Sequence, residues 1–136
     1  PDQVDVLRRS IGTLIDAMEA HDVRRLVNLS GAGVEVPGDR KPAFDRLMSR
    51  LVRLFARHVV AAKQAEFDEL ARSGLDWVAV RPPLVRDGPR TGEYRSGLDV
   101  LHPGARISRA DVADFMLSQA TAPTFVRQAP FVCYAR

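Results

Sequence analysis

The sequence has one cysteine, two lysines and no long apolar run. Cys133 has no second cysteine to pair with, which fits a reducing compartment, so we expect the protein to be cytoplasmic. No uninterrupted apolar stretch approaches the ~18 residues that cross a bilayer, so no membrane contact is expected. The three histidines and Cys133 are scattered without the spacing of metal ligands, and no metal site is predicted.

The positive charge is small and is not clustered. The chain carries 20 basic and 17 acidic residues, a net charge of +3, and its only lysines are Lys41 and Lys63. The arginines alternate with acidic residues along the expected helices, without a basic block or interleaved aromatic residues. Since nucleic acids are bound by a clustered basic surface, nucleic-acid binding is not expected. A length of 136 residues fits one domain.

The central stretch 73–83 predicts a helix end, a buried strand and a rigid turn. Ser73-Gly74 is expected to close the helix through a left-handed glycine. Leu75 to Val80 is short, β-branched and aromatic with no polar face, which is typical of a strand buried on both sides. Pro82-Pro83 then ends the strand, because proline has no amide hydrogen for a strand ladder.

The remaining segments predict alternating helices and strands. Apolar spacing predicts a helix over 4–20, followed by a buried strand over 24–30. A long helical stretch over 43–74 is expected to bend near 57–60, and its apolar part over 44–55 is a candidate pocket wall or homodimer contact through 43–57. Ser108 is expected to cap a helix with Asp111 three residues on. We also expect a polar loop over 85–90, an extended piece over 91–95, and an edge strand over 129–134.

Helices that deliver buried strands indicate an α/β fold with a parallel sheet and flanking helices. Two buried strands would leave unpaired backbone groups at the sheet's flanks. We therefore expect 1–136 to be the C-terminal part of a single, larger domain.

Three blocks in this order, 73–83, 87–94 and 106–117, resemble the NAD(P)H-binding, NmrA-like atypical short-chain dehydrogenase/reductase family. The most similar subgroup contains flavin reductase (biliverdin reductase B). This resemblance implies a Rossmann-like fold and an NADP or NAD cofactor. The family's first βαβ unit carries a glycine-rich phosphate-binding turn, and that turn is missing from this chain. Gly31-Ala32-Gly33 leads into a proline-containing loop rather than a helix, so it does not replace that turn.

The resemblance also implies the residues at the nicotinamide end of the cofactor. Ser30 matches a serine or threonine that faces the nicotinamide, and Lys63 matches the lysine of a Tyr-x-x-x-Lys pair; both are candidate catalytic and cofactor-binding residues. The tyrosine position holds Val59, which has no proton to give. The turn Pro82, Pro83 and Leu84 matches the cofactor-binding turn after the strand. The structural alternatives are a serine bonded to its own loop, a solvated helix lysine and a turn that only ends the strand.

The resemblance implies a reductase that passes hydride to a small, flat acceptor such as a flavin or quinone. The stretch 44–55 and the loop 85–94 are expected to wall the acceptor pocket. A non-catalytic NAD(P) sensor is the alternative, favoured by Val59 and by Gly31 where the family commonly has a second hydroxyl residue. A helical interaction domain is a third, and it depends only on the amphipathic stretch after Pro42.

Overall fold

A computed structural model describes residues 2–39, 57–122 and 124–135 of the chain. The helices are α1 (Gln3–Ala20), α3 (Arg57–Arg72) and α4 (Arg109–Thr121). The strands are β1 (Arg25–Leu29), β2 (Asp76–Val80), β3 (Leu84–Arg86), β4 (Arg95–Gly97), β5 (Arg106–Ser108) and β6 (Phe131–Cys133). In the described ranges, no helix is both long enough and apolar enough to cross a membrane.

The centre of the fold is a pair of parallel strands, β1 and β2, in which Arg25 pairs with Asp76 and Leu29 with Val80. The second edge of β2 is occupied by the segment before β6. The Ala79 amide donates to the Gln128 carbonyl at 3.1 Å, and the Arg81 backbone amide donates to the Pro130 carbonyl at 2.8 Å. The prediction that the last extended segment, 129–134, joins the sheet edge is therefore confirmed for its start, at Pro130 and Phe131, whereas the rest of β6 pairs with β4.

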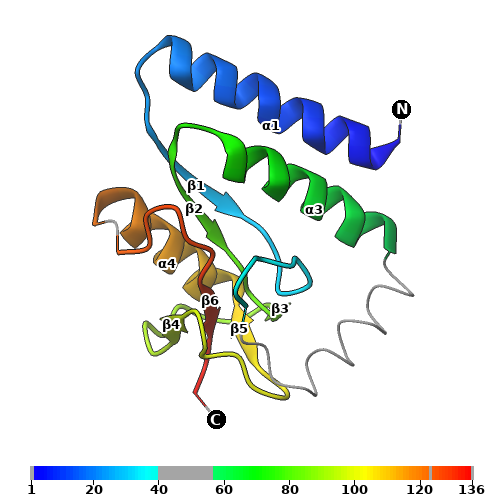
Figure 1. The fold of residues 1–136 in the computed structure, drawn as a ribbon. Coiled ribbons are helices and arrows are strands. Elements are labelled where there is room, and N and C mark those ends of the chain that lie inside the picture. The colour runs from blue at the N-terminus through cyan, green and yellow to red at the C-terminus, as the bar shows by residue number, and fades with distance from the viewer. Residues whose placement is uncertain (1, 40–56, 123, 136) are drawn as a thin grey trace.

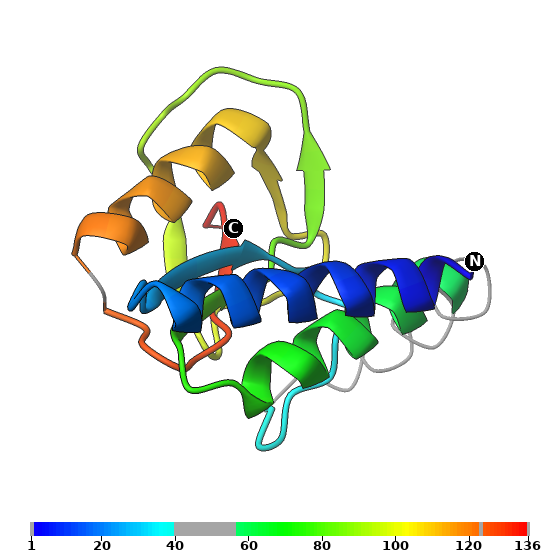
Figure 2. The same ribbon diagram turned by 90° about the horizontal axis from the view of Figure 1, so that it is seen from above.

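Helices cover both faces of this pair, as the two views show (Figures 1 and 2). On one face α1 and α3 pack side by side, and Trp77 and Ala79 of β2 lie in their core. On the other face Val78 and Val80 pack with residues of α4, including Phe115. Because successive β2 residues point to opposite faces, the uninterrupted apolar stretch serves both cores, as its composition predicted.

β1 differs from the prediction of a buried strand. Its residues are half-buried, and Leu29 is 43% exposed. Its pairing partner is β2, and no second strand among the described residues lies on its other edge. The amino-acid pattern fits a buried strand, but burial requires neighbours on both edges.

Of the two helix ends predicted from the sequence, the Ser108 cap is confirmed and the Gly74 end is not. Asp2 caps α1, and the Ser108 hydroxyl accepts the Asp111 amide at 3.0 Å at the start of α4. At the end of α3, however, Gly74 is not left-handed, so that prediction was wrong. There the Ser73 hydroxyl donates to the Leu70 carbonyl at 2.7 Å and accepts the Leu75 amide at 3.3 Å.

The region after the double proline contains short strands that the sequence did not indicate. Leu84–Arg86, expected as the start of a loop, forms β3 and pairs in parallel with β5. The extended piece expected at 91–95 begins later, as β4, which pairs antiparallel with β6. A strand as short as β3 or β5 carries too little periodicity to be recognised from its own residues. Of the predicted helical stretch 43–74, residues 57–72 form α3. The part over 43–56, which carries most of the predicted homodimer contact, lies outside the described residues.

Candidate functional site

Hydrogen bonds continue past the carboxyl ends of β1 and β2. The Ser30 amide donates to the Val80 carbonyl at 2.8 Å, and the Ala32 amide donates to the Pro82 carbonyl at 3.2 Å. Ser30 therefore lies beside the double-proline turn. This is the edge at which open α/β sheets bind ligands, as the sequence predicted.

Ser30 is buried, with 8% of its surface exposed. Its Oγ is enclosed and has no hydrogen-bond partner among the described residues. The alternative that this hydroxyl bonds to its own loop is therefore wrong. A buried hydroxyl without a partner costs free energy, and such groups are concentrated at functional sites. Ser30 thus has unused hydrogen-bonding capacity, enclosed beside the sheet edge.

Lys63 extends from α3 to the same edge. Its Nζ donates to the Leu29 carbonyl at 3.1 Å and to Glu66 Oε2 at 2.7 Å. The Lys63 side chain is 32% exposed and that of Glu66 is 10% exposed. The alternative of a solvated helix lysine is therefore wrong, because the ammonium is held against the residue that precedes Ser30.

The position one helical turn before Lys63 holds Val59, which is 57% exposed. Residues four apart share one face of a helix, so Val59 and Lys63 lie on the same side of α3. A valine supplies no proton, and the adjacent His58 lies about 100° further around the helix. Proton donation from this helix position is therefore missing from the candidate site.

The turn after β2 combines buried and exposed residues. Pro82 is buried, Pro83 is partly buried, and Leu84 at the start of β3 is 52% exposed. The Pro82 carbonyl is already engaged by Ala32. The three residues thus give a rigid wall beside Ser30, with the Leu84 side chain open to solvent.

Arg81, the residue before this turn, is fully buried. Its guanidinium donates to both Asp39 carboxylate oxygens, at 2.6 and 2.7 Å, and to the Val34 and Ala129 carbonyls at 3.2 and 2.8 Å. It also stacks on the Phe131 ring, 4.0 Å from the ring centre. One side chain thus fastens the loop after β1 to β2 and to the last segment of the chain.

A cavity of about 570 Å³ adjoins Arg81. It is lined by Val36, Pro37, Gly38, Asp39, Trp77, Arg81, Leu98, Asp99, Arg127, Gln128 and Ala129. The loop 85–94 does not line this cavity, and its role as a wall of an acceptor pocket stays a prediction. The other predicted wall, 44–55, lies outside the described residues.

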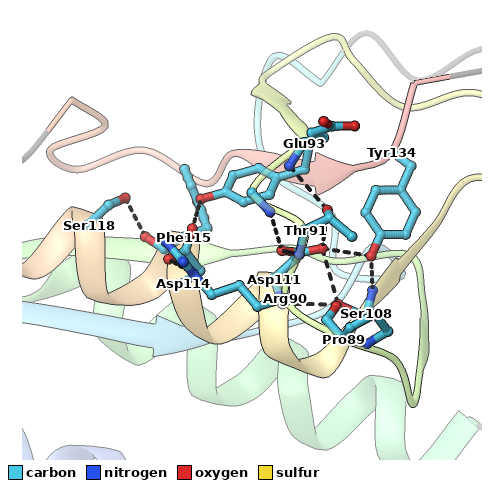
Figure 3. A network of polar contacts seen from close by, with 12 residues as sticks. Pro89, Arg90, Thr91, Glu93, Ser108, Asp111, Asp114, Phe115, Ser118 and Tyr134 are labelled. Atoms are coloured by element: carbon cyan, nitrogen blue, oxygen red, sulfur yellow. Dashed lines mark hydrogen bonds and ion pairs between the residues drawn. The ribbon is translucent and has the colours of Figure 1, made fainter.

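The loop 87–94 is instead bound to α4 through Asp111 (Figure 3). The fully buried Asp111 carboxylate accepts from the Thr91 and Gly92 amides and from the hydroxyls of Thr91, Ser108 and Tyr134, at distances of 2.7 to 3.2 Å. Burial opposes ionisation of this carboxyl. The hydrogen bonds from Tyr134, Gly92 and Thr91 outweigh burial and hold the pKa of Asp111 well below its usual range.

A second carboxylate of α4, Asp114, binds the middle and the end of the same loop. It accepts from Arg90 Nε at 2.6 Å and from the Tyr94 hydroxyl at 2.9 Å. Burial, reinforced by the hydrogen bond to Asp114, raises the pKa of Tyr94 to about 12. These contacts fix the loop against α4.

The sequence patterns did not indicate Glu66, Arg81 or Asp39 as residues of the site. Glu66 stands three residues after Lys63, and this spacing places the two on one helix face, so it was detectable. The contact between Arg81 and Asp39 spans 42 residues and depends on the path of a loop. No local pattern indicates it.

Comparison with known proteins decides the family. Residues 2–123 match the model of a protein family described as NAD(P)H-binding. This range covers most of the chain and includes strands β1 and β2 and helices α1, α3 and α4.

The chain belongs to this NAD(P)H-binding family.

Solved structures of similar fold agree with this membership. An anaerobillin reductase, ChuY, from Escherichia coli O157:H7 is 25% identical, with a TM-score of 0.72 over 97% of this chain and 58% of that one. The chuY protein of E. coli CFT073 is 26% identical, with a TM-score of 0.73 over 92% of this chain and 64% of that one. A Veillonella parvula short-chain dehydrogenase/reductase in complex with NADP is 21% identical, and its TM-score of 0.69 over 92% of this chain and 57% of that one shows a shared fold.

This chain spans less than two thirds of the length of each of these proteins. Its fold is the α/β, Rossmann-like fold that the sequence predicted, with parallel strands and helices on both faces.

Proposed function

We propose that this chain forms the nicotinamide end of the cofactor site of an NAD(P)H-dependent reductase. One observation carries the proposal, and it lies at the carboxyl edge of a parallel sheet. The Ser30 hydroxyl, which has no hydrogen-bond partner among the described residues, lies beside the double-proline turn, and the Lys63 ammonium is anchored on the neighbouring Leu29 carbonyl. Family membership supplies the cofactor class.

The residues at this edge fit a nicotinamide riboside. The enclosed Ser30 hydroxyl has unused hydrogen-bonding capacity, which suits a carboxamide or an acceptor carbonyl. An ammonium has three N–H donors, and Leu29 and Glu66 use two of those on Lys63. The third suits a ribose hydroxyl. Pro82, Pro83 and Leu84 form the adjoining wall and restrict how a flat ring is oriented.

The nicotinamide supplies hydride when it is bound, and the protein's task is to orient the two rings and to exclude water. The absence of an acid at Val59 favours acceptors that need no proton from that position. We therefore propose a flat acceptor such as a flavin or quinone, reduced with NADPH or NADH. The glycine-rich turn that binds a pyrophosphate is not in this sequence, and the proposal covers the nicotinamide end alone.

The test is oxidation of NADPH and NADH by the full-length protein, with a flavin and a quinone as acceptors. The proposal expects cofactor binding and acceptor-dependent loss of absorbance at the reduced nicotinamide band. Binding without turnover with either acceptor contradicts the reductase and favours the second candidate, a non-catalytic NAD(P) sensor, which Val59 and Gly31 support. Absence of binding contradicts both.

A further inference from the structure

We propose that Glu66 is a positioning residue, which holds the Lys63 ammonium at the carboxyl end of β1 so that one N–H is aimed at the cofactor. The inference rests on the proposed function, because it assigns Lys63 to the cofactor. The inference adds Glu66, which lies about one helical turn after Lys63 on α3 and acts on the cofactor only through Lys63.

The burial of Glu66 is the first support. Glu66 is 8% exposed, and a buried carboxylate is costly unless it is paired. Its partner is the Lys63 ammonium, 2.7 Å away. The same ammonium donates to the Leu29 carbonyl, so Nζ is fixed by two acceptors from two different elements.

Two other ion pairs with the same three-residue spacing show what an ordinary surface pair looks like. Arg72 and Glu69, also on α3, are 3.7 Å apart with side chains 70% and 36% exposed. Arg8 and Asp5 on α1 are likewise 3.7 Å apart, and both are at least half exposed. Such exposed pairs contribute little. The pair of Lys63 and Glu66 is shorter, more buried and connected to β1.

The ion pair with Glu66 also determines which chemical group Lys63 is suited to bind. Glu66 already compensates the ammonium charge, so the remaining N–H acts as a directed donor to a neutral hydroxyl rather than as a free charge for a phosphate. A flexible lysine chain without Glu66 would lose this direction, because its rotamer freedom would return.

The first experiment measures, without any cofactor, how strongly Glu66 restrains the Lys63 ammonium. With only Lys41 and Lys63 in the chain, peptide mass spectrometry reports the acylation rate of each lysine by an amine-reactive ester. We expect Glu66→Gln to accelerate Lys63 modification several-fold relative to Lys41. Glu69→Gln, on the same helix, is the matched control and should leave the rate unchanged. An unchanged Lys63 rate in Glu66→Gln overturns the inference.

The second experiment is a double-mutant cycle in NADPH affinity with Glu66→Gln, Lys63→Met and the double variant. Glu66→Gln should weaken binding about tenfold, as expected for loss of a charge-assisted hydrogen bond. The same change should have almost no effect in the Lys63→Met background, because Glu66 acts through Lys63. A merely structural role would give additive effects, and additivity overturns the inference.

The two experiments separate the inference from the proposed function. If Glu66→Gln frees Lys63 for acylation but NADPH affinity is unchanged, the proposed function stands and the role of Glu66 in binding is overturned. If the wild-type protein binds no nicotinamide cofactor, the proposed function itself fails and the positioning role fails with it. Thermal midpoints of all variants report whether each change is confined to the site.

Discussion

Arg81 and Asp39 form a two-point ion pair, with Nη1 and Nη2 of the arginine 2.6 and 2.7 Å from the two carboxylate oxygens. The Arg81 side chain is completely buried and that of Asp39 is 15% exposed. The pair joins the loop after β1 to the residue that precedes the double proline. It therefore holds together the two chain segments that flank the candidate site.

Asp39→Asn should destabilise the fold strongly, because it leaves a buried guanidinium without its counter-charge. Loss of one partner of a buried pair costs about 3 kcal/mol or more. Urea denaturation should show this loss as a lower midpoint with an unchanged slope. Asp99→Asn, an exposed carboxylate of the same cavity, should leave the midpoint within about 0.5 kcal/mol of wild type. Equal effects of the two substitutions would contradict the structural role of the pair.

The Asp111 carboxylate should make the free energy of unfolding depend on pH in the acidic range. Its hydrogen bonds lower its pKa in the folded state below the value of about 3.9 in an unfolded chain. The unfolded state therefore binds more protons than the folded state at acidic pH. The stabilisation that the ionised Asp111 carboxylate contributes is complete above about pH 4 and is lost as the pH falls towards the folded-state pKa. Denaturation between about pH 2 and pH 6 should therefore be less pH-dependent in Asp111→Asn than in wild type.

Asp87→Asn is the control for acid dependence, because the Asp87 side chain is 90% exposed and pairs with Arg109 on the surface. It should preserve the wild-type slope of stability against pH. A wild-type slope in Asp111→Asn would show that this carboxylate is not the group whose protonation weakens the fold.

Tyr94 should ionise at unusually high pH, near 12 rather than 10. Because the folded-state pKa is the higher one, the associated stability is complete below about pH 10 and is lost as pH rises through 12. Ultraviolet titration is feasible, since the chain has two tyrosines. Asp114→Asn removes the acceptor of the Tyr94 hydroxyl and should lower this pKa, although burial maintains part of the shift. Titration of Tyr94 near 10 in wild type would contradict the contact.

The sequence predicted the central architecture well, because its signals are local. The apolar run in β2 and the Ser108 cap each depend on neighbours within a few residues, and both are present in the structure. The double proline and the end of β1 meet at the sheet edge because parallel strands bring their carboxyl ends together. The position of Ser30 beside Pro82 follows from that rule.

The long-range contacts were not predictable in the same way. The burial of Arg81 requires the loop that carries Asp39, and the anchoring of 87–94 requires the Asp111 carboxylate to turn away from solvent. An arginine and an aspartate are ordinarily surface residues. Their burial is decided by partners 42 and 19 positions away, which periodicity does not register.

Ser30→Ala should separate function from stability. The Ser30 hydroxyl has no partner among the described residues, so its removal deletes a buried polar group without breaking a bond. Thermal unfolding should be unchanged or shifted slightly upward, while affinity for NADPH or turnover falls severalfold. Clear destabilisation with normal NADPH affinity would indicate a structural hydroxyl instead.

The most direct measurement of the central claim is the affinity of the full-length protein for NADPH and NADH, in wild type and in Lys63→Met. The account predicts that wild type binds at least one of the two and that Lys63→Met weakens this binding about tenfold or more while the protein stays folded. No binding by wild type, or equal affinity in the two proteins, would contradict the assignment of this sheet edge to the nicotinamide cofactor.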